Sequence, residues 1–120
     1  MSEHFKRIDT VFLQVSDFEK AVDWYCSVLG FTLRWNDPMN GYAALNIGET
    51  SLTLVRKTNQ VENPNTHMSF NFYTPNIEQA YNHLKEHNIE LEHLNEDGTF
   101  KWFEFKDLEG NRLGVCSFPE

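Results

Sequence analysis

Five histidines and two cysteines supply the imidazole and thiol groups of this 120-residue chain. His83 and His87 stand four residues apart, a spacing that places two imidazoles on one face of a helix. They flank the apolar stripe of that helix, so we expect both to face solvent. Cys26 and Cys116 form no CxxC pair, and nothing in their spacing suggests a disulfide framework. The histidines and cysteines therefore show no clear metal-binding constellation.

A single histidine or cysteine could still act in a metal-free reaction. His67 opens a predicted strand, and imidazole titrates near neutrality, as a general base must. Cys116 could be a nucleophile, but no base is evident beside it, so we expect an unreactive thiol. For His67, a plain surface position is the alternative to a catalytic role.

Aromatic residues make up 14% of the chain, and Phe alone accounts for ten of them. Much of this excess fits ordinary core packing. Some of it could line a ligand pocket, since Phe12, Trp35, Tyr42 and Trp102 stand in or beside predicted strands. Trp102 shares its strand face with Glu104, and an aromatic face beside a carboxylate suits a flat cation.

The net charge of −8 limits the classes of partner. Nucleic-acid binding depends on Lys and Arg neutralising phosphates, so this chain is not expected to bind nucleic acid or an anionic membrane surface. The first ten residues contain no apolar signal region, and no later run could span a bilayer. We expect a cytoplasmic protein with reduced thiols.

An internal repeat indicates how these residues are positioned. Residues 10–33 predict a strand, a helix and a second strand, and a weaker copy begins near Ser69. A shift of 59 residues aligns Phe18 with Ile77 and Ala21 with Ala80. We therefore predict one domain, residues 1–120, made from module one (1–56), a linker (57–66) and module two (67–120). The site should lie where the halves meet.

Each module has the pattern βαβββ. In module one, Ser16 and Glu19 form a capping box before the helix, and Gly30 ends it. In module two, Asn76 with Gln79 or Thr74 with Pro75 could start the helix. Asn88 ends it, since Asn tolerates a left-handed backbone. The predicted strands are residues 8–15, 31–35, 42–47, 51–56, 67–73, 90–94, 99–106 and 112–118.

Two motifs carry a family resemblance. The first runs from Val11 through Leu13, Val15 and Asp17–Ala21 to the Val28–Phe31 segment. The second is Asp107–Leu108–Glu109–Gly110–Asn111, with Leu108 where Pro is usual. Together they resemble the vicinal oxygen chelate superfamily, which includes glyoxalase I, the extradiol dioxygenases and the bleomycin-resistance proteins. The resemblance implies an α+β fold in which two βαβββ modules pair into a curved, cavity-forming mixed sheet with helices outside.

In the enzymes that this chain resembles, four inward strand positions hold one divalent metal. The matching residues here are Thr10, Thr53, Ser69 and Gly114. His67 lies two residues before Ser69 on the same strand face. Such metals need imidazole, carboxylate or thiolate donors, so we predict neither a family-type metal centre nor another cofactor. The predicted pocket residues are Thr10, Phe12, Trp35, Tyr42, Thr53, His67, Ser69, Trp102, Glu104, Gly114 and Cys116.

The resemblance leaves three functional hypotheses. The first is a metal-free module of the sequestration or resistance type, which binds an aromatic or cationic small molecule and forms a homodimer. The second is a lyase or dioxygenase-type enzyme that uses His67 or an unrecognised metal site. The third is a structural or regulatory protein whose cavity is filled by Phe side chains.

Overall fold

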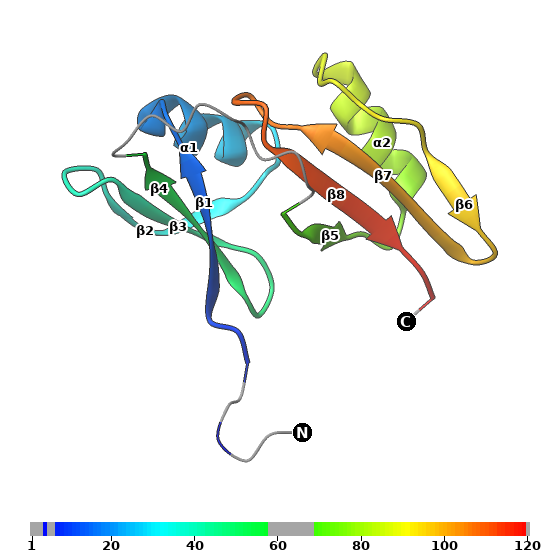
Figure 1. The fold of residues 1–120 in the computed structure, drawn as a ribbon, viewed down its shortest axis with the longest axis horizontal. Coiled ribbons are helices and arrows are strands. Elements are labelled where there is room, and N and C mark those ends of the chain that lie inside the picture. Colours follow the sequence, from blue (N-terminus) through cyan, green and yellow to red (C-terminus); the bar gives the residue numbers. More distant parts are fainter. Residues whose placement is uncertain (1–3, 5–6, 58–68, 120) are drawn as a thin grey trace. The chain divides into compact units, whose positions relative to one another are not determined.

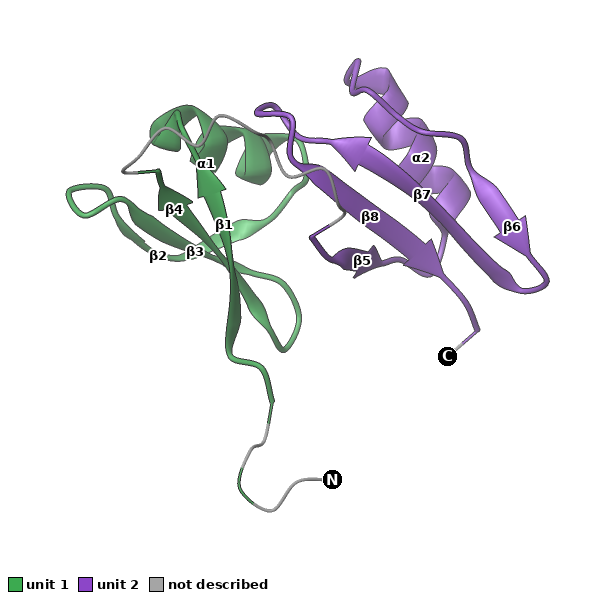
Figure 2. Cartoon of the chain, in the orientation of Figure 1, with its two compact units in different colours: residues 1–60 green, residues 61–120 purple. Residues whose placement is uncertain are grey.

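The computed structural model describes residue 4, residues 7–57 and residues 69–119. These residues belong to two compact units, residues 1–60 and 61–120 (Figure 2). In its described part, each unit has the order strand, helix, strand, strand, strand (Figure 1). Among the described residues, no helix is long and apolar enough to cross a membrane.

The first unit is a mixed sheet with one helix. Its strands lie in the order β1-β4-β3-β2, and β1 runs parallel to β4 while the other pairs are antiparallel. The elements are β1 (Thr10–Val15), α1 (Phe18–Ser27), β2 (Thr32–Asp37), β3 (Tyr42–Asn46) and β4 (Ser51–Arg56).

The second unit repeats this topology. Its strand order is β5-β8-β7-β6, with β5 parallel to β8. The elements are β5 (Asn71–Tyr73), α2 (Ile77–Glu86), β6 (Asn95–Asp97), β7 (Phe100–Lys106) and β8 (Arg112–Ser117). The predicted α+β fold of two βαβββ halves is confirmed.

Strand alternation separates a core face from a more open face in the first unit. Leu13 and Val15 are buried, whereas Phe12, which precedes Leu13 and points to the opposite face of the strand, is 65% exposed. Leu52 and Leu54 of β4 are buried on the same side as Leu13 and Val15. The helical stripe of α1 supplies the rest of this core: Phe18, Ala21, Val22 and Tyr25. Each large apolar side chain buried there contributes roughly 1.5–3 kcal/mol.

The second unit has an equivalent core beneath α2. Phe103 and Phe105 of β7 are buried, and so are Leu113 and Val115 of β8. The Tyr81 ring of α2 meets Phe103 edge-on, with the ring centres 4.9 Å apart. In both units the helix therefore covers one sheet face, and the side chains that alternate with the core occupy the other face.

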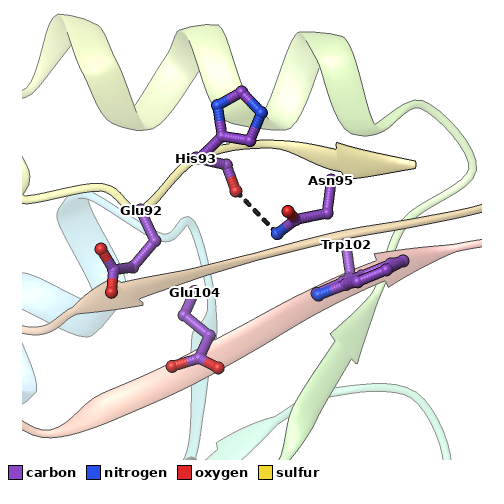
Figure 3. Close-up of a pocket in the computed structure, with 5 residues that line it drawn as sticks. All are labelled: Glu92, His93, Asn95, Trp102 and Glu104. Atoms are coloured by element: carbon purple, nitrogen blue, oxygen red, sulfur yellow. Dashed lines mark hydrogen bonds between the residues drawn. The ribbon is translucent and has the colours of Figure 1, made fainter. Parts of the chain in front are cut away.

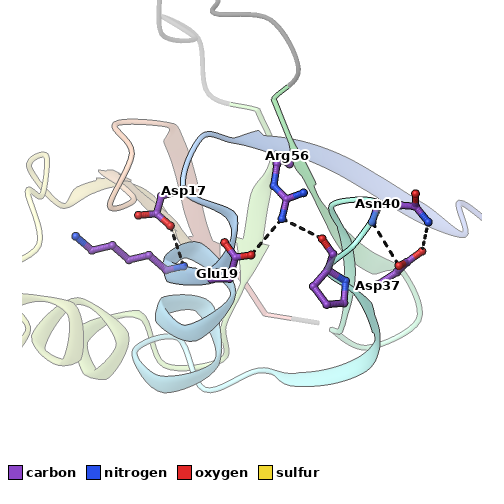
Figure 4. Close-up of polar contacts among 7 residues, drawn as sticks. Asp17, Glu19, Asp37, Asn40 and Arg56 are labelled. Carbon is purple, nitrogen blue, oxygen red and sulfur yellow. Dashed lines mark hydrogen bonds and ion pairs between the residues drawn. The ribbon is translucent and has the colours of Figure 1, made fainter.

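The ends of the helices test the predicted caps. The Asp17 carboxylate accepts a hydrogen bond from the Lys20 amide at 3.2 Å (Figure 4). The Asp17 carbonyl accepts another from the Ala21 amide. The prediction that Ser16 caps α1 is therefore wrong. A carboxylate also interacts more favourably than a hydroxyl with the positive end of the helix dipole.

The cap of α2 agrees with one of the two predicted arrangements. The Asn76 side chain accepts a hydrogen bond from the Gln79 amide at 3.1 Å. At the other end, Asn88 adopts the predicted left-handed backbone with φ 58°. Gly30, which follows α1, has φ 83°.

The strand predicted at residues 90–94 is wrong. In that segment Leu91 forms a single bridge to Phe105, with backbone hydrogen bonds from Glu92 to Glu104 and from Lys106 to Glu90, but the segment forms no continuous strand. The strand β6 instead includes Asn95–Asp97, where the polar composition indicated a turn. The hairpin turn is shorter than expected, because Gly98 with φ 63° and Thr99 suffice to connect Asp97 to its partner Phe100. Of the strand predicted at 67–73, residues 67 and 68 lie outside the described residues, and β5 begins at Asn71.

Arg56 connects three segments of the first unit (Figure 4). Its guanidinium forms an ion pair with Glu19 at 3.2 Å and donates to the Pro38 carbonyl at 3.0 Å. The same group lies over the Phe18 ring, 4.9 Å from the ring centre. The end of β4 is thereby held against α1 and against the β2–β3 turn.

Candidate functional site

Five of the predicted pocket residues lie on the sheet face of the first unit that points away from α1. Strand register places Phe12 beside Thr53, Thr53 beside Ala44 and Ala44 beside Trp35. Tyr42 lies beside Val55 on the same face, and Thr10 precedes Phe12 by two residues. The aromatic members remain open to solvent, with 65% of Phe12, 46% of Trp35 and 40% of Tyr42 exposed.

A chain of hydroxyl groups joins β1 to β4 on this face. The Oγ1 atoms of Thr10 and Thr53 are 2.7 Å apart, and Thr10 Oγ1 lies 3.0 Å from the Ser51 carbonyl. Both bonds form together when Thr53 donates to Thr10 and Thr10 donates to the carbonyl. Both hydroxyl protons are then used within the sheet, and Thr53 is buried.

Arg34 adds a positive charge to the same face. Its Nη1 atom donates to the Ser51 hydroxyl at 3.0 Å. Ser51 lies beside Thr10 in the β1–β4 register. The face of the first unit thus combines exposed aromatic rings with a cation.

Ser69 and Gly114 correspond in the second unit to Thr10 and Thr53 in the first. Phe12 pairs with Thr53 across the parallel strands β1 and β4, and Asn71 pairs with Gly114 across β5 and β8. Thr10 and Ser69 each stand two residues before the first member of the pair. The internal repeat therefore extends to the strand register at the four positions.

The donors at these four positions do not fit a divalent metal ion. Thr10, Thr53 and Ser69 offer neutral hydroxyl groups, and Gly114 offers no side chain. Zinc, iron, nickel and manganese sites in proteins are built from imidazole, carboxylate or thiolate groups. Across residue 4, residues 7–57 and residues 69–119, no group of three or more His, Cys, Asp and Glu side chains is placed to hold a metal.

The second unit contains a hollow of about 230 Å³ beside β7 (Figure 3). Two of its lining residues, Trp102 and Glu104, belong to the predicted pocket. Glu104 lies directly beside Gly114, and Trp102 lies beside Cys116. In the internal repeat, Cys116 corresponds to Val55 of the first unit. Val55 pairs with Tyr42 and Cys116 pairs with Trp102, so Trp102 occupies the position equivalent to Tyr42.

Three further lining residues were missed in the sequence: Glu92, His93 and Asn95. The Glu92 amide donates to the Glu104 carbonyl at 2.8 Å, which brings the segment before β6 against β7. The Asn95 side-chain amide donates to the His93 carbonyl at 3.0 Å (Figure 3). Because Glu92 and Glu104 are twelve residues apart, no local sequence pattern predicts this contact.

The charges at the hollow leave one negative charge in excess. Arg112 Nη2 lies 2.5 Å from Glu104 Oε1 and 3.5 Å from Glu92 Oε1, so one guanidinium serves two carboxylates. The Glu104 side chain is 29% exposed and that of Glu92 is 64% exposed. A cationic group can therefore approach both carboxylates from solvent.

A row of aromatic rings extends from the hollow across the sheet of the second unit. The ring centres are 5.4 Å apart for Trp102 and Phe100, 6.1 Å for Phe100 and Phe118, and 5.0 Å for Phe118 and Tyr73. The Tyr73 hydroxyl donates to the Phe118 carbonyl at 2.8 Å. Phe100 and Phe118 were not among the predicted pocket residues, although Phe100 alternates with Trp102 and Glu104 along one strand face.

The remaining predicted residues differ in their surroundings. Cys116 is buried, and burial raises the pKa of its thiol, which opposes a role as a thiolate nucleophile. Burial, with a smaller effect from the Asp23 carboxylate, also raises the pKa of Cys26. His67 lies outside the described residues. The structure describes the two units separately, so the prediction that the site lies where the halves meet stays a prediction.

A family model described as the Glyoxalase/Bleomycin resistance protein/Dioxygenase superfamily matches residues 7–115. No curated protein matches the chain. Three solved structures that resemble it illustrate the range of the fold. TnmS3, an antibiotic-binding protein from Streptomyces sp. CB03234, has 22% identity and a TM-score of 0.84, covering 98% of this chain and 100% of that one.

The second of these structures is a lactoylglutathione lyase from Agrobacterium tumefaciens, with 17% identity, a TM-score of 0.77 and 96% of each chain covered. The third is a member of the same superfamily from Sphaerobacter thermophilus DSM 20745, with 20% identity and a TM-score of 0.77, covering 94% of this chain and 98% of that one. At these identities the likeness shows a shared fold.

Proposed function

The chain belongs to the Glyoxalase/Bleomycin resistance protein/Dioxygenase superfamily, and we propose that it binds a small flat aromatic cation without a metal ion. The binding site is the hollow lined by Trp102, Glu92 and Glu104 (Figure 3). The observation that carries the proposal is the presence of an indole ring and two solvent-accessible carboxylates at one hollow. Sequestration of the bound compound, as in a resistance protein, is the function that this chemistry supports best.

The charge of the hollow favours a cationic ligand. Arg112 neutralises one of the two carboxylates, which leaves a net charge of −1 for a ligand to pair with. The net charge of −8 on the whole chain draws cations toward the protein at low ionic strength. A cation over the indole face adds about 0.5–2 kcal/mol, with the larger value in a site shielded from water.

The aromatic row supports a flat ligand. Phe100 continues the apolar surface from Trp102, and Phe118 continues it from Phe100. Stacked and edge-on ring contacts contribute roughly 0.5–1.5 kcal/mol each beyond the buried area. TnmS3, which has a similar fold, is an antibiotic-binding protein, and this agrees with a binding role for the fold.

We propose that the protein forms a homodimer, on the family resemblance alone. Sedimentation equilibrium of the purified protein measures its oligomeric state.

The experiment compares two three-ring probes of matched shape. Calorimetric titration with cationic proflavine and neutral acridone measures how much the charge contributes. We expect proflavine to bind more tightly than acridone. Glu104→Gln should remove most of that difference, because it deletes the carboxylate that shares a strand face with Trp102 while keeping the side-chain shape.

Variants of two tryptophans locate the site. Trp102→Leu should weaken proflavine binding about 2- to 30-fold, the equivalent of the cation–π energy. Trp35→Leu, which alters the exposed face of the other unit, should leave the affinity unchanged. Equal binding of proflavine by the Trp102→Leu variant and the unaltered protein would show that the hollow is not the site.

The enzymatic alternative uses His67 or an unrecognised metal site, and the His67 form can be tested by substitution. Loss of an observed lyase or dioxygenase activity in His67→Ala, with that activity retained in Trp102→Leu, would contradict the binding proposal in favour of catalysis.

A further inference from the structure

We propose a second binding site, for Cu(II) or Ni(II), formed by His83 and His87 at the carboxyl end of α2. It is separate from the hollow beside Trp102 and does not depend on the proposed small-molecule function. Both histidines are exposed and occupy positions i and i+4 of the helix end. Their ring centres are 4.7 Å apart, and the ring planes are inclined by 51°.

The hydrogen bond of His87 fixes its tautomer. Its Nδ1 atom lies 2.9 Å from the His83 carbonyl, and a carbonyl oxygen can only accept, so Nδ1 carries the proton. The lone pair of a neutral His87 ring is then on Nε2. Donation of one ring N–H to a backbone carbonyl is the usual way in which proteins orient a metal-binding imidazole.

The ring spacing indicates the coordination geometry. With metal–nitrogen bonds of about 2.0–2.1 Å and ring centres about 1.2 Å beyond the nitrogen, two imidazoles bound at about 90° have centres roughly 4.6 Å apart. A tetrahedral angle would separate them by about 5.3 Å. The observed 4.7 Å agrees with the right-angled arrangement of tetragonal Cu(II) and Ni(II) sites. Zn(II), which prefers tetrahedral coordination, fits the pair less well.

The helix dipole near the pair favours a cation, and the neighbouring charged side chains add no net charge. The last carbonyl groups of a helix carry partial negative charge, and His87 is the C-cap residue of α2. Lys85 and Glu86 flank the site with opposite charges. Glu90 forms an ion pair with Lys106 at 3.1 Å. Since the described residues contain no group of three metal-binding side chains, water would complete the coordination of an ion held by these two.

The test uses metal alone as the probe and a variant that changes only the spacing. Lys85→His combined with His87→Lys keeps the composition and charge but places the two histidines two residues apart, on different faces of the helix. Every protein in the series also carries His4→Gln, so that the histidine nearest the amino terminus contributes no binding. His93→Gln is the matched control for an exposed histidine elsewhere in the second unit.

Titration with Cu(II) and Ni(II) is followed by calorimetry and, for Cu(II), by the nitrogen hyperfine pattern in electron paramagnetic resonance. The protein with His83 and His87 should bind Cu(II) with two equatorial nitrogens. The spacing variant should bind roughly tenfold or more weakly, because a second linked ligand raises the effective concentration at the ion. His93→Gln should leave the affinity for Cu(II) and Ni(II) unchanged. Equal affinity in the spacing variant, with an unchanged circular dichroism spectrum, would overturn the proposal.

Discussion

At the scale of single residues, the threonine pair Thr10 and Thr53 joins two strands through side-chain hydrogen bonds. Thr10 and Thr53 satisfy each other and the Ser51 carbonyl on one sheet face. Neither hydroxyl retains a proton for an incoming group when both bonds form. Two positions that the family resemblance matches to metal ligands therefore form part of the hydrogen-bonded sheet in this protein.

A double-mutant cycle measures the interaction between the two threonine hydroxyl groups. Thr10→Val and Thr53→Val should each lower the free energy of unfolding, and the double variant should lose less than the sum of the two single losses. The coupling free energy should be about 0.5–1.5 kcal/mol, the net value of one intramolecular hydrogen bond. Urea unfolding gives the free energies. Strict additivity would contradict a direct hydroxyl–hydroxyl bond.

The buried thiol of Cys116 should make the stability of the folded protein depend on pH. Burial raises its pKa in the folded protein, so the unfolded chain loses its thiol proton at a lower pH than the folded chain. This contribution to stability is fully present below the ordinary thiol pKa and is lost as the pH rises through the folded value. The stability advantage of the native protein over Cys116→Ala should therefore shrink above about pH 9.

Thermal unfolding of the native protein and Cys116→Ala between pH 7 and 10.5 measures this difference in stability.

The Cys26→Ser variant, in which Cys116 is the thiol under study, should react slowly with a disulfide reagent at pH 8 until the protein is unfolded. Rapid reaction of native Cys26→Ser protein would show that Cys116 is accessible and ionised.

At the scale of elements, the turn between β7 and β8 depends on one carboxylate. Asp107 is buried, and its Oδ1 atom accepts from the Glu109 and Asn111 amides at 2.9 Å each. Its Oδ2 atom accepts from the Asn111 side chain at 3.0 Å. The Asp107 carboxylate thus accepts three hydrogen bonds in the turn, which backbone bonds from Asp107 to Asn111 and from Gly110 to Asp107 also close, although Leu108 replaces the usual Pro.

Asp107→Ala should lower the free energy of unfolding by about 2–4 kcal/mol, because it removes three hydrogen bonds to a buried carboxylate, two of them from Asn111. Glu109→Ala, in the same turn, should cost less than about 1 kcal/mol. Urea denaturation of both variants makes the comparison. A similar loss in the two variants would mean that general turn composition, and not the Asp107 carboxylate, closes the hairpin.

The first helix provides a test of the corrected cap. Asp17→Ala should destabilise the protein by about 1 kcal/mol, because the Lys20 amide loses its acceptor. Ser16→Ala should have the smaller effect of the two. The reverse order in urea unfolding would restore Ser16 as the cap that the sequence indicated.

Local patterns predicted most of the fold, and contacts distant in sequence account for what they missed. The helix stripes, the Asn76 cap and the left-handed Asn88 depend on neighbours within a few residues, and the structure bears them out. The position of β6 depends on pairing with β7, and a polar run such as Asn95–Asp97 gives no local sign of it. Alternation of residue types placed Trp102 and Glu104 on one face, but Glu92 is brought beside them by its backbone bond to Glu104 and by the ion pair that both carboxylates form with Arg112.

At the scale of the whole molecule, the acidic balance should govern how fast a cation arrives. With a net charge of −8, association of proflavine should slow as salt rises from 20 to 500 mM. The change should appear mainly in the association rate, because long-range attraction is screened beyond about 10 Å at 0.1 M salt. Stopped-flow fluorescence measures the association rate and the dissociation rate separately. An association rate independent of salt would argue against electrostatic capture.

The most direct test of the binding claim is nuclear magnetic resonance of the indole N–H groups. The chain has three tryptophans, so three signals report on three places: Trp24 on α1, Trp35 on β2 and Trp102 on β7. Titration with proflavine should shift the Trp102 signal with saturation and leave Trp24 unchanged. A shift confined to Trp35, or no saturable shift at Trp102, would contradict a ligand site at the hollow of the second unit.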